Sequence, residues 1–253
     1  MNADSSSKST VGSVVKAARL LELFSMDQPE MTLGELTAGS GYNKTTTHRL
    51  LQTLVGVGWL VRAEGGGYRL GGQLLALGGI ARAGIDLRAE ALPVLRHLAH
   101  ELGDTAFLMV PGRVGAVMIE SVVGSNPLQV HGLTAGSILP YHVAAGPVVL
   151  VAYSPELEEA VLAGDRVAYT EHTVCDVEAL RTRLAEVRKA GYAVSREDYI
   201  VGVGAVAAPV LAADGTPVAS LSMGGPVSQF EGERLERAIG LVAQAAEDLG
   251  RHL

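Results

Sequence analysis

The sequence predicts an α+β protein in two parts, a small winged helix-turn-helix followed by a larger antiparallel sheet flanked by helices. An amphipathic helix over 43–55 holds no acidic residue, and a short helix and a glycine-containing turn precede it. Strand-like runs around a glycine-rich turn follow within 59–70. Beyond residue 103, hairpin-connected β-rich runs lie between helices, as in a sheet with helices packed on it. We therefore expect a disordered tail (1–10), a winged domain (11–70), a linker helix (71–85) and a second domain (86–253).

The composition indicates a protein with a substantial core. The 253 residues are 48% hydrophobic and 19% charged, which excludes a largely disordered chain. A single cysteine, Cys175, cannot form an intrachain disulfide, and this fits a reducing compartment. The first ten residues lack the apolar stretch of a signal peptide, and no run of about 18 apolar residues predicts a membrane span. We expect a soluble, cytoplasmic protein with no membrane partner.

The charge is unevenly distributed along the chain. The net charge of −7 excludes a generally basic coat for nucleic acid. Residues 1–70, however, carry seven Lys and Arg against six Asp and Glu, whereas the remainder carries 13 against 21. A near-neutral head with basic elements on an acidic body favours a DNA-reading module attached to a part that does not touch DNA.

Two helices are expected before the acid-free one. The first spans 11–26, with an apolar stripe of Val11, Val14, Ala18 and Leu21 that Val15 and Phe24 extend. Thr32 and Glu35 form a capping box, which begins a short helix through about Ala38. Gly39-Ser40-Gly41 then forces a turn.

The helix over 43–55 has two contrasting faces. Its apolar face holds Thr47, Leu50, Leu51 and Leu54 at helical spacing. Short hydrogen-bonding groups, an imidazole and a guanidinium share the opposite face, which holds Thr45, His48, Arg49 and Gln52. Such a face suits phosphates and base edges, and an Asn43 N-cap would direct the helix dipole toward phosphate. The alternative is an ordinary core helix with a polar outer face.

The segment after this helix is expected to form a wing. Residues 59–62 and 68–70 are strand-like around the turn at 63–67, so Arg62 and Arg69 are available to a phosphate backbone. The glycines of the turn lack a following helix that begins with Lys-Ser/Thr, which argues against a nucleotide-binding loop.

The linker continues as a helix with an unusual interruption. Residues 71–84 carry an apolar stripe of Leu74, Leu75, Leu77 and Ile80 that Gly78-Gly79 interrupts. The glycines indicate either a close helix–helix contact or hinge, or a frayed connector. Asp86 could cap the next helix, to about Leu102.

The body is expected to alternate strands and helices. Helices are predicted at 143–153, from Pro155, at 176–190 and at 230–252. Strands are predicted at 105–110, 114–122, 128–133, 192–195, 204–212 and 217–223.

No constellation for catalysis is visible in the body. Gly202-x-Gly204-x-x-Ala207 matches a dinucleotide fingerprint, but it leads into a hairpin and not a helix, so we reject it. There is no Gly-x-Ser-x-Gly motif and no paired acid–base or metal-binding set, so we predict no catalytic residue, metal or cofactor. Ala144-Ala145-Gly146 before a helix would expose N–H donors to a carboxylate, and Ser222 could add a hydroxyl. Close packing is the alternative explanation for these small residues.

Three stretches of the chain resemble the IclR-type bacterial transcription regulators. The resemblance rests on Val-x-Ser-Val-x-Lys-Ala-x-x-Leu-Leu-Glu-Leu-Phe at 11–24, Lys-Thr-Thr-Thr-His-Arg-Leu-Leu-Gln-Thr-Leu at 44–54 and Tyr-Arg-Leu-Gly at 68–71, and it continues to the C-terminus. It implies a GAF-like effector-binding domain at 86–253 and a linker helix that helps form a dimer. It also implies amides of Ala145 and Gly146 that meet a small acid. Further polar positions and apolar walls are implied at Ser195, Ala205, Ser222, Leu128, Leu139 and Val203.

The chain departs from the family pattern near this implied site. Ser195 stands where many members have Asp or Glu, Ala205 where many have Cys or a similar polar residue, and Gly146-Pro147 replaces the usual Gly-Lys. These differences argue against a glyoxylate- or pyruvate-like ligand and favour a less polar one. We expect His142 to be structural.

The sequence therefore predicts a cytoplasmic, ligand-responsive transcription regulator, most simply a repressor. We expect it to bind a palindromic operator as a homodimer, or a dimer of dimers, and to bind a small organic acid or related metabolite. The predicted DNA-contacting residues are Asn43, Lys44, Thr45, Thr46, His48, Arg49, Gln52, Arg62 and Arg69. The alternatives are a small-molecule-processing enzyme with a helix-turn-helix appendage and an architectural DNA binder. The missing catalytic set argues against the first, and the acidic, pocket-forming body argues against the second.

Overall fold

The structure is a computed structural model that describes residues 11–25, 28–83, 86–130 and 132–251. The predicted tail at 1–10 lies outside the described residues. The chain divides by its contacts into two compact units, residues 1–84 and residues 85–253, and each is described by itself. Among the described residues, no helix has both the length and the apolar character that crossing a membrane requires.

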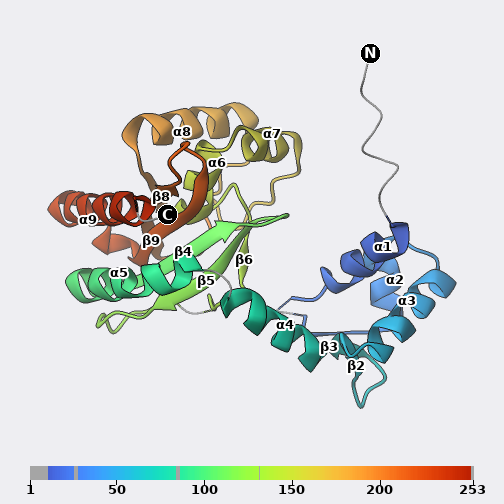
Figure 1. Cartoon of the computed structure of the whole chain (residues 1–253). Helices are drawn as coiled ribbons and strands as arrows, with labels where there is room; N and C mark the ends of the chain where they lie inside the picture. The colour runs from blue at the N-terminus through green and yellow to red at the C-terminus, as the bar shows by residue number, and fades with distance from the viewer. Residues whose placement is uncertain (1–10, 26–27, 84–85, 131, 252–253) are drawn as a thin grey trace. The chain divides into compact units, whose positions relative to one another are not determined.

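The N-terminal unit is a helical domain with a small antiparallel sheet (Figure 1). Its helices are α1 (Gly12–Leu21), α2 (Leu33–Ser40), α3 (Lys44–Gly56) and α4 (Gly72–Ala83), and its strands are β1 (Glu30–Met31), β2 (Leu60–Arg62) and β3 (Tyr68–Leu70). The strand order is β1-β3-β2, so the predicted wing forms and β1 adds a strand that the sequence did not predict. The core of the unit comprises Leu20, Met31, Leu36, Leu51, Leu54, Leu60 and Tyr68.

The prediction for the first helix was wrong in its length and in its buried face. α1 ends at Leu21, because Leu23 and Phe24 donate their N–H groups to carbonyls three residues back, which tightens the chain into a turn. Leu20 is fully buried, whereas Val11, Val14 and Val15 are 63%, 65% and 51% exposed. The end predicted at Met26 lies outside the described residues. Turning early lets Leu23 and Phe24 pack on the core in place of the valines.

A glycine fixes the junction between the wing and α4. The N–H of Gly71 donates to the carbonyl of Trp59 at 2.8 Å. A Cβ at Gly71 would lie 2.2 Å from the carbonyl oxygen of Gly58, so only glycine permits this approach. Beyond it, α4 continues through Gly78-Gly79 without a break.

The C-terminal unit is built on a six-stranded antiparallel sheet with strand order β6-β5-β4-β9-β8-β7. The strands are β4 (Thr105–Pro111), β5 (Ala116–Val122), β6 (Ile138–Leu139), β7 (Ala193–Arg196), β8 (Val203–Leu211) and β9 (Pro217–Pro226). The predicted hairpin between β8 and β9 forms, and its turn contains Gly215 with φ +85°. This topology confirms the predicted antiparallel α+β fold.

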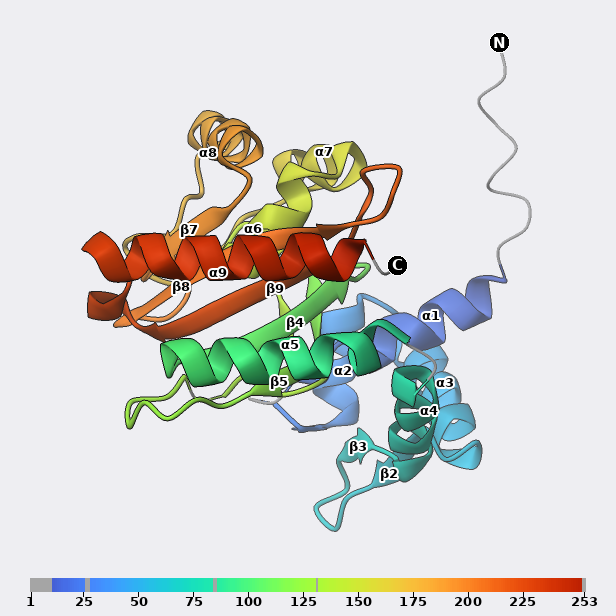
Figure 2. The ribbon, with the colours of Figure 1, turned by 60° about the vertical axis from the view of Figure 1, so that its left-hand side comes forward.

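Helices cover both faces of the sheet. Helices α5 (Asp86–Leu102) and α9 (Gly232–Gly250) lie side by side on one face, as Figure 2 shows. On the other face lie α6 (Ala145–Ala152), α7 (Pro155–Ala163) and α8 (Val177–Ala190). A short 3₁₀ helix, Val227–Gln229, leads into α9. Each face buries its own apolar cluster, so the sheet is the central layer of a three-layer unit.

The predicted strand at 128–133 was wrong, because none of its described residues forms a strand. In its place, Ile138 and Leu139 form β6 and pair with Val117 and Ala116 of β5. The amide of Gln129 explains the difference, because it accepts from Thr105 Oγ1 at 2.7 Å and donates to the carbonyl of Gly124 at 3.2 Å. Side-chain bonds of this kind hold a loop and replace a strand ladder.

Candidate functional site

Helix α3 begins with a complete N-cap. Asn43 Oδ1 accepts the N–H of Thr46 at 2.8 Å, and Thr47 Oγ1 donates to the Asn43 carbonyl at 3.1 Å. Thr47, Leu51 and Leu54 are buried against the rest of the unit. These contacts fix the rotation of the helix about its axis and so decide which face remains outside.

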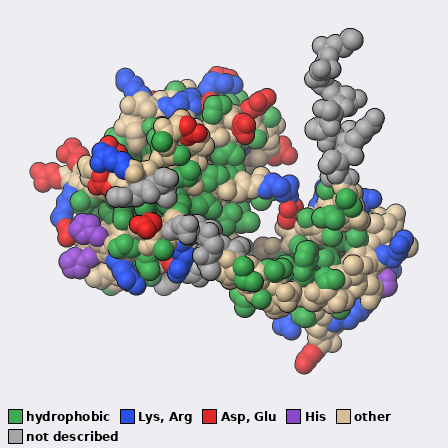
Figure 3. All heavy atoms as spheres, viewed as in Figure 1, with side chains coloured by type: hydrophobic (Ala, Val, Ile, Leu, Met, Phe, Trp, Pro, Cys, Tyr) green, Lys and Arg blue, Asp and Glu red, His purple; other side chains and the backbone are tan. Residues whose placement is uncertain are grey.

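The outer face of α3 is the one that the sequence predicted. Thr45, His48, Arg49 and Gln52 are exposed, with Lys44 exposed and Thr46 half-buried beside them. Gln52 Nε2 lies 3.4 Å from His48 Nε2, so the two side chains support each other. The helix has no carboxylate, and Figure 3 shows Lys and Arg side chains along the edge of this unit near α2 and α3, with few acidic ones.

The preceding elements hold α3 in a helix-turn-helix. Thr32 Oγ1 accepts the Glu35 N–H at 3.3 Å and Glu35 Oε2 accepts the Thr32 N–H at 2.7 Å, which completes the predicted capping box at the start of α2. Gly41 ends α2 with φ +71°, a conformation that glycine adopts without strain. The turn to α3 is therefore fixed at both ends.

The two wing arginines are exposed but face opposite sides of the sheet. Arg62 pairs in register with Tyr68, and its guanidinium carbon lies 5.1 Å from the Tyr68 ring centroid. Arg69 pairs in register with Val61 and with Glu30 on the other face. Because directly opposed residues share a face of a sheet, the two cations cannot meet one phosphate row in the same way.

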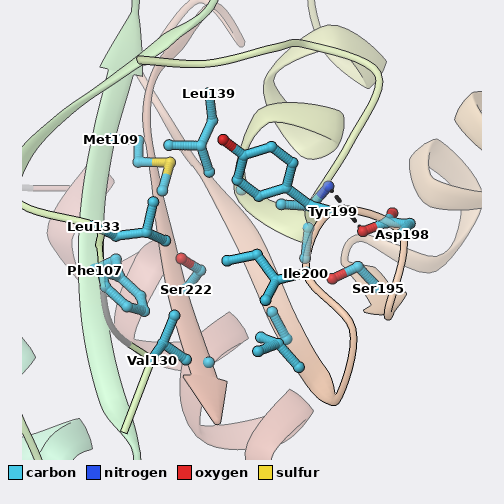
Figure 4. Close-up of a pocket in the computed structure, with 16 residues that line it drawn as sticks. Phe107, Met109, Val130, Leu133, Leu139, Ser195, Asp198, Tyr199, Ile200 and Ser222 are labelled. Atoms are coloured by element: carbon cyan, nitrogen blue, oxygen red, sulfur yellow. Dashed lines mark hydrogen bonds between the residues drawn. The ribbon is translucent and has the colours of Figure 1, made fainter. Parts of the chain in front are cut away.

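The C-terminal unit encloses a cavity of about 40 Å³ between α6, the sheet and the loop after β7 (Figure 4). Its walls are mainly apolar. The side chains of Phe107, Met109, Val130, Leu133 and Leu139 line one side, and that of Ile200 reaches in from the other. The volume holds only a few water molecules.

Polar groups gather at one end of the cavity. Ser195 and Ser222 are buried residues that line it. Behind the lining, Ser220 Oγ is fully buried beside Gly146 and lacks a hydrogen-bond partner among the described residues. The first turn of α6 presents the N–H groups of Ala145 and Gly146 at the same place. Buried polar groups of this kind are normally satisfied, so the cavity is equipped for a ligand with oxygen atoms.

A carboxylate fixes the start of α6. Asp198 is buried, and its Oδ1 accepts the N–H of Ala144 at 3.0 Å while Oδ2 accepts from Arg183 at 2.7 Å. Ala144 has φ +55° and Glu197 has φ +56°, both strained for residues with a Cβ. The two strained residues flank the Asp198 contact, so this network holds the polar end of the cavity in one shape.

The structure brings most of the predicted effector positions together. Leu139, Ala145, Gly146, Ser195, Val203, Ala205 and Ser222 line the cavity, whereas Leu128 is 67% exposed and does not. The sequence did not point to Asp198, Tyr199 or Ile200. It also missed Phe107 and Met109, although their spacing of two on a predicted strand places them on one face.

The remaining candidates have structural roles. His142 is buried, and its Nε2 donates to the Val167 carbonyl at 2.9 Å. Gly204 lies inside β8, opposite Gly225 of β9, and Gly202 lies in the turn just before β8, so neither glycine leads into a helix. Within the described ranges, no group of three His, Cys, Asp or Glu side chains is placed to hold a metal.

Comparison with known proteins matches the two units to the two domains of one protein family. Residues 13–64 match the family model of the IclR helix-turn-helix domain, and residues 81–251 match that of the bacterial transcriptional regulator IclR C-terminal domain. The glycerol operon regulatory protein of Streptomyces coelicolor is 30% identical, with 96% of each chain covered.

Solved structures show the same likeness. A putative IclR transcriptional regulator from Silicibacter sp. TM1040 superposes with a TM-score of 0.85 at 30% identity, covering 95% of this chain and 96% of the other. An IclR homolog from Microbacterium hydrocarbonoxydans, complexed with 4-hydroxybenzoate, superposes with a TM-score of 0.72 at 26% identity, covering 95% of this chain and 100% of the other.

Proposed function

This chain belongs to the IclR family of bacterial transcriptional regulators, and from that premise we propose how its two units divide the work. It is a regulator with a helix-turn-helix DNA-binding domain and a C-terminal effector domain. In our proposal, residues 11–70 contact an operator, and residues 71–85 form the linker helix that joins this domain to the next. Residues 86–253 bind a small molecule that changes operator affinity. We propose that the chain represses transcription in its basal state and that it acts in the cytoplasm.

The observation that carries the DNA proposal is the outer face of α3. It is exposed, free of carboxylates and rotated outward by the buried Thr47, Leu51 and Leu54. We propose that Thr45, His48 and Arg49 meet base edges and phosphates in the major groove. Asn43, Lys44, Thr46 and Gln52 support that contact, and Arg62 and Arg69 are the wing candidates.

The test is operator binding by an Arg49→Ala variant. A duplex that the wild-type chain selects from a random-sequence library serves as the operator. We expect the variant to lose about 1–3 kcal/mol of binding free energy if Arg49 meets a base, with relaxed specificity there, or to show a salt slope lower by about 1 if it meets a phosphate. Unchanged affinity together with an unchanged salt dependence would remove Arg49 from the interface.

We propose that the cavity beside α6 binds the effector. The free N–H groups of Ala145 and Gly146 and the hydroxyls of Ser195 and Ser222 suit an acid or hydroxyl group, and the apolar walls suit a carbon skeleton. None of the described residues that line the cavity is Lys or Arg, which favours a weakly polar ligand over a small, highly charged acid. An aromatic ring needs roughly 150 Å³, so such a ligand requires the lining at Ile200 to move outward.

The relatives named above are a regulatory protein and transcriptional regulators, and among the described residues no feature of this site favours an enzyme. We propose that the chain acts as a homodimer, or as a dimer of dimers, on a palindromic operator. The support is the exposed apolar surface of α4, where Leu75 and Ile80 are 81% and 71% exposed. An exposed apolar stripe of this kind is typical of a surface that meets a partner.

A further inference from the structure

Two cations on α1 lie at the start of α3. Lys16 and Arg19 are exposed and are one helical turn apart. Lys16 Nζ lies 5.8 Å, and the Arg19 guanidinium carbon 5.9 Å, from the ring centroid of Tyr42. Tyr42 directly precedes Asn43, the N-cap of α3. Packing between α1 and α3 therefore places two positive charges at the end of the helix whose outer face lacks acid.

These cations are positioned without being neutralised. Within the part of the chain that the structure describes, neither Lys16 nor Arg19 forms an ion pair. An aromatic ring attracts a cation and restrains it but leaves its charge available, unlike a carboxylate partner. The same arrangement recurs on the wing, where Arg62 lies over Tyr68. Every cation–π pair among the described residues belongs to the N-terminal unit.

We propose that Lys16 and Arg19, held by Tyr42, contact the phosphate backbone of duplex DNA beside the groove that α3 enters. This rests on the proposed function, since only a duplex on α3 brings phosphates to both ends of that helix. Phosphates beside the start of α3 meet Lys16 and Arg19, and phosphates beyond the other end of α3 meet the wing. Restraint by the ring reduces the entropy lost when the long side chains settle on a phosphate.

The test compares two charge-matched double variants of the full chain. Lys16→Gln/Arg19→Gln removes the proposed contacts, and Arg181→Gln/Lys189→Gln removes two exposed charges from α8 in the other unit. Binding to a random-sequence duplex and to a library-selected duplex is measured between about 50 and 200 mM salt. Two lost phosphate contacts should reduce the loss of affinity across this range by about tenfold relative to wild type, and the control should match wild type.

A variant of the ring separates DNA contact from a structural role. Tyr42→Phe keeps the aromatic face and should retain the wild-type salt slope, whereas Tyr42→Leu should weaken binding at low salt. Unfolding followed by fluorescence of Trp59, the single tryptophan, shows whether the unit stays folded. If wild type binds both duplexes and the Lys16→Gln/Arg19→Gln slope equals that of the control, this inference is overturned while the proposed function stands. If wild type binds no duplex, both fall.

Discussion

Arg62 and Arg69 show how the position of a residue along its strand decides which face of the sheet its side chain joins. Both are exposed on the wing, yet Arg62 lies over Tyr68 while Arg69 stands opposite Glu30 on the other face. A directly opposed carboxylate offsets part of the positive charge that a phosphate would meet. The two arginines, which the sequence treats alike, are therefore unequal candidates for DNA contact.

We expect Arg62→Ala to weaken operator binding more than Arg69→Ala. Loss of the Arg62 contact should lower the salt slope by about 1, whereas the Arg69→Ala slope should stay closer to wild type because Glu30 is the register partner of Arg69 on the same face. The measurement is the dissociation constant over a series of salt concentrations. A larger effect of Arg69→Ala would show that the outer face of the wing, and not the Tyr68 side, meets the backbone.

Gly146 is the residue through which the effector proposal is most directly tested. A Cβ there would lie 3.2 Å from Met109 Sδ, 3.3 Å from Ser220 Oγ and 3.5 Å from Ser222 Oγ. Gly146→Ala should therefore fill the polar end of the cavity at an overpacking cost of about 1–3 kcal/mol. We expect ligand affinity to fall at least tenfold.

The matched control for Gly146→Ala is Gly240→Ala on α9, where a Cβ meets nothing within 4 Å. Organic acids and phenols that raise the melting temperature of wild type are titrated against both variants. Equal ligand affinity in the two variants would place the effector outside the cavity.

At the scale of elements, the capping box of α2 couples stability to pH. Hydrogen bonds from the Thr32 N–H and hydroxyl to the Glu35 carboxylate hold its pKa below the ordinary value of 4.5. A lowered pKa in the folded state means that the stabilisation is complete above pH 4.5 and is lost as pH falls through the lowered value. Glu35→Gln keeps the acceptor but removes this pH dependence.

We expect Thr32→Ala to lower the free energy of unfolding of the N-terminal unit by about 1 kcal/mol. The wild-type advantage over Glu35→Gln should be present at neutral pH and should shrink below pH 4.5. Denaturant unfolding monitored by Trp59 fluorescence reports this unit alone, since it holds the single tryptophan. A wild-type advantage that grew on acidification would contradict the assigned role of Glu35.

The elements that the sequence predicted well are those whose signals are local. Asn43 caps α3, Asp176 caps α8 and Gly191 ends α8 in the left-handed conformation, all within a few residues of the helices they bound. The buried face of α1 and the identity of β6 were missed because distant partners decide them. Val14 has the same periodicity as a core residue, but nothing in the unit covers it.

In the candidate site, too, the sequence predicted the features with local signals and missed those that depend on distant partners. The sequence places Ala145 and Gly146 at a helix start, because helix starts have local signatures. Asp198 was missed because its importance depends on Arg183 and Ala144, which lie 15 and 54 residues away. The less polar ligand stays a prediction, and the apolar lining that supports it comes from side chains on several segments that only folding brings together.

At the scale of the whole molecule, α4 exposes apolar side chains that no contact within one chain covers among the described residues. It runs unbroken through Gly78-Gly79, and a Cβ at either glycine would meet nothing within 4 Å. Of the two alternatives from the sequence, a frayed connector does not fit a continuous helix. Two glycines in a helix still cost about 1 kcal/mol each relative to Ala, and this favours a close contact with a second copy or a hinge.

We expect Leu75→Glu/Ile80→Glu to convert the proposed dimer into a monomer. Both side chains are largely exposed, so burying them against a partner would contribute about 1.5–3 kcal/mol each, and a carboxylate there would oppose association. A monomer engages only one half of a palindrome, so operator affinity should fall on the order of a hundredfold or more. Analytical ultracentrifugation gives the mass.

The control is Val123→Glu, which replaces an aliphatic side chain 64% exposed in the other unit. It should leave both mass and operator affinity unchanged. A Leu75→Glu/Ile80→Glu chain that sediments as wild type would mean that α4 does not carry the dimer contact.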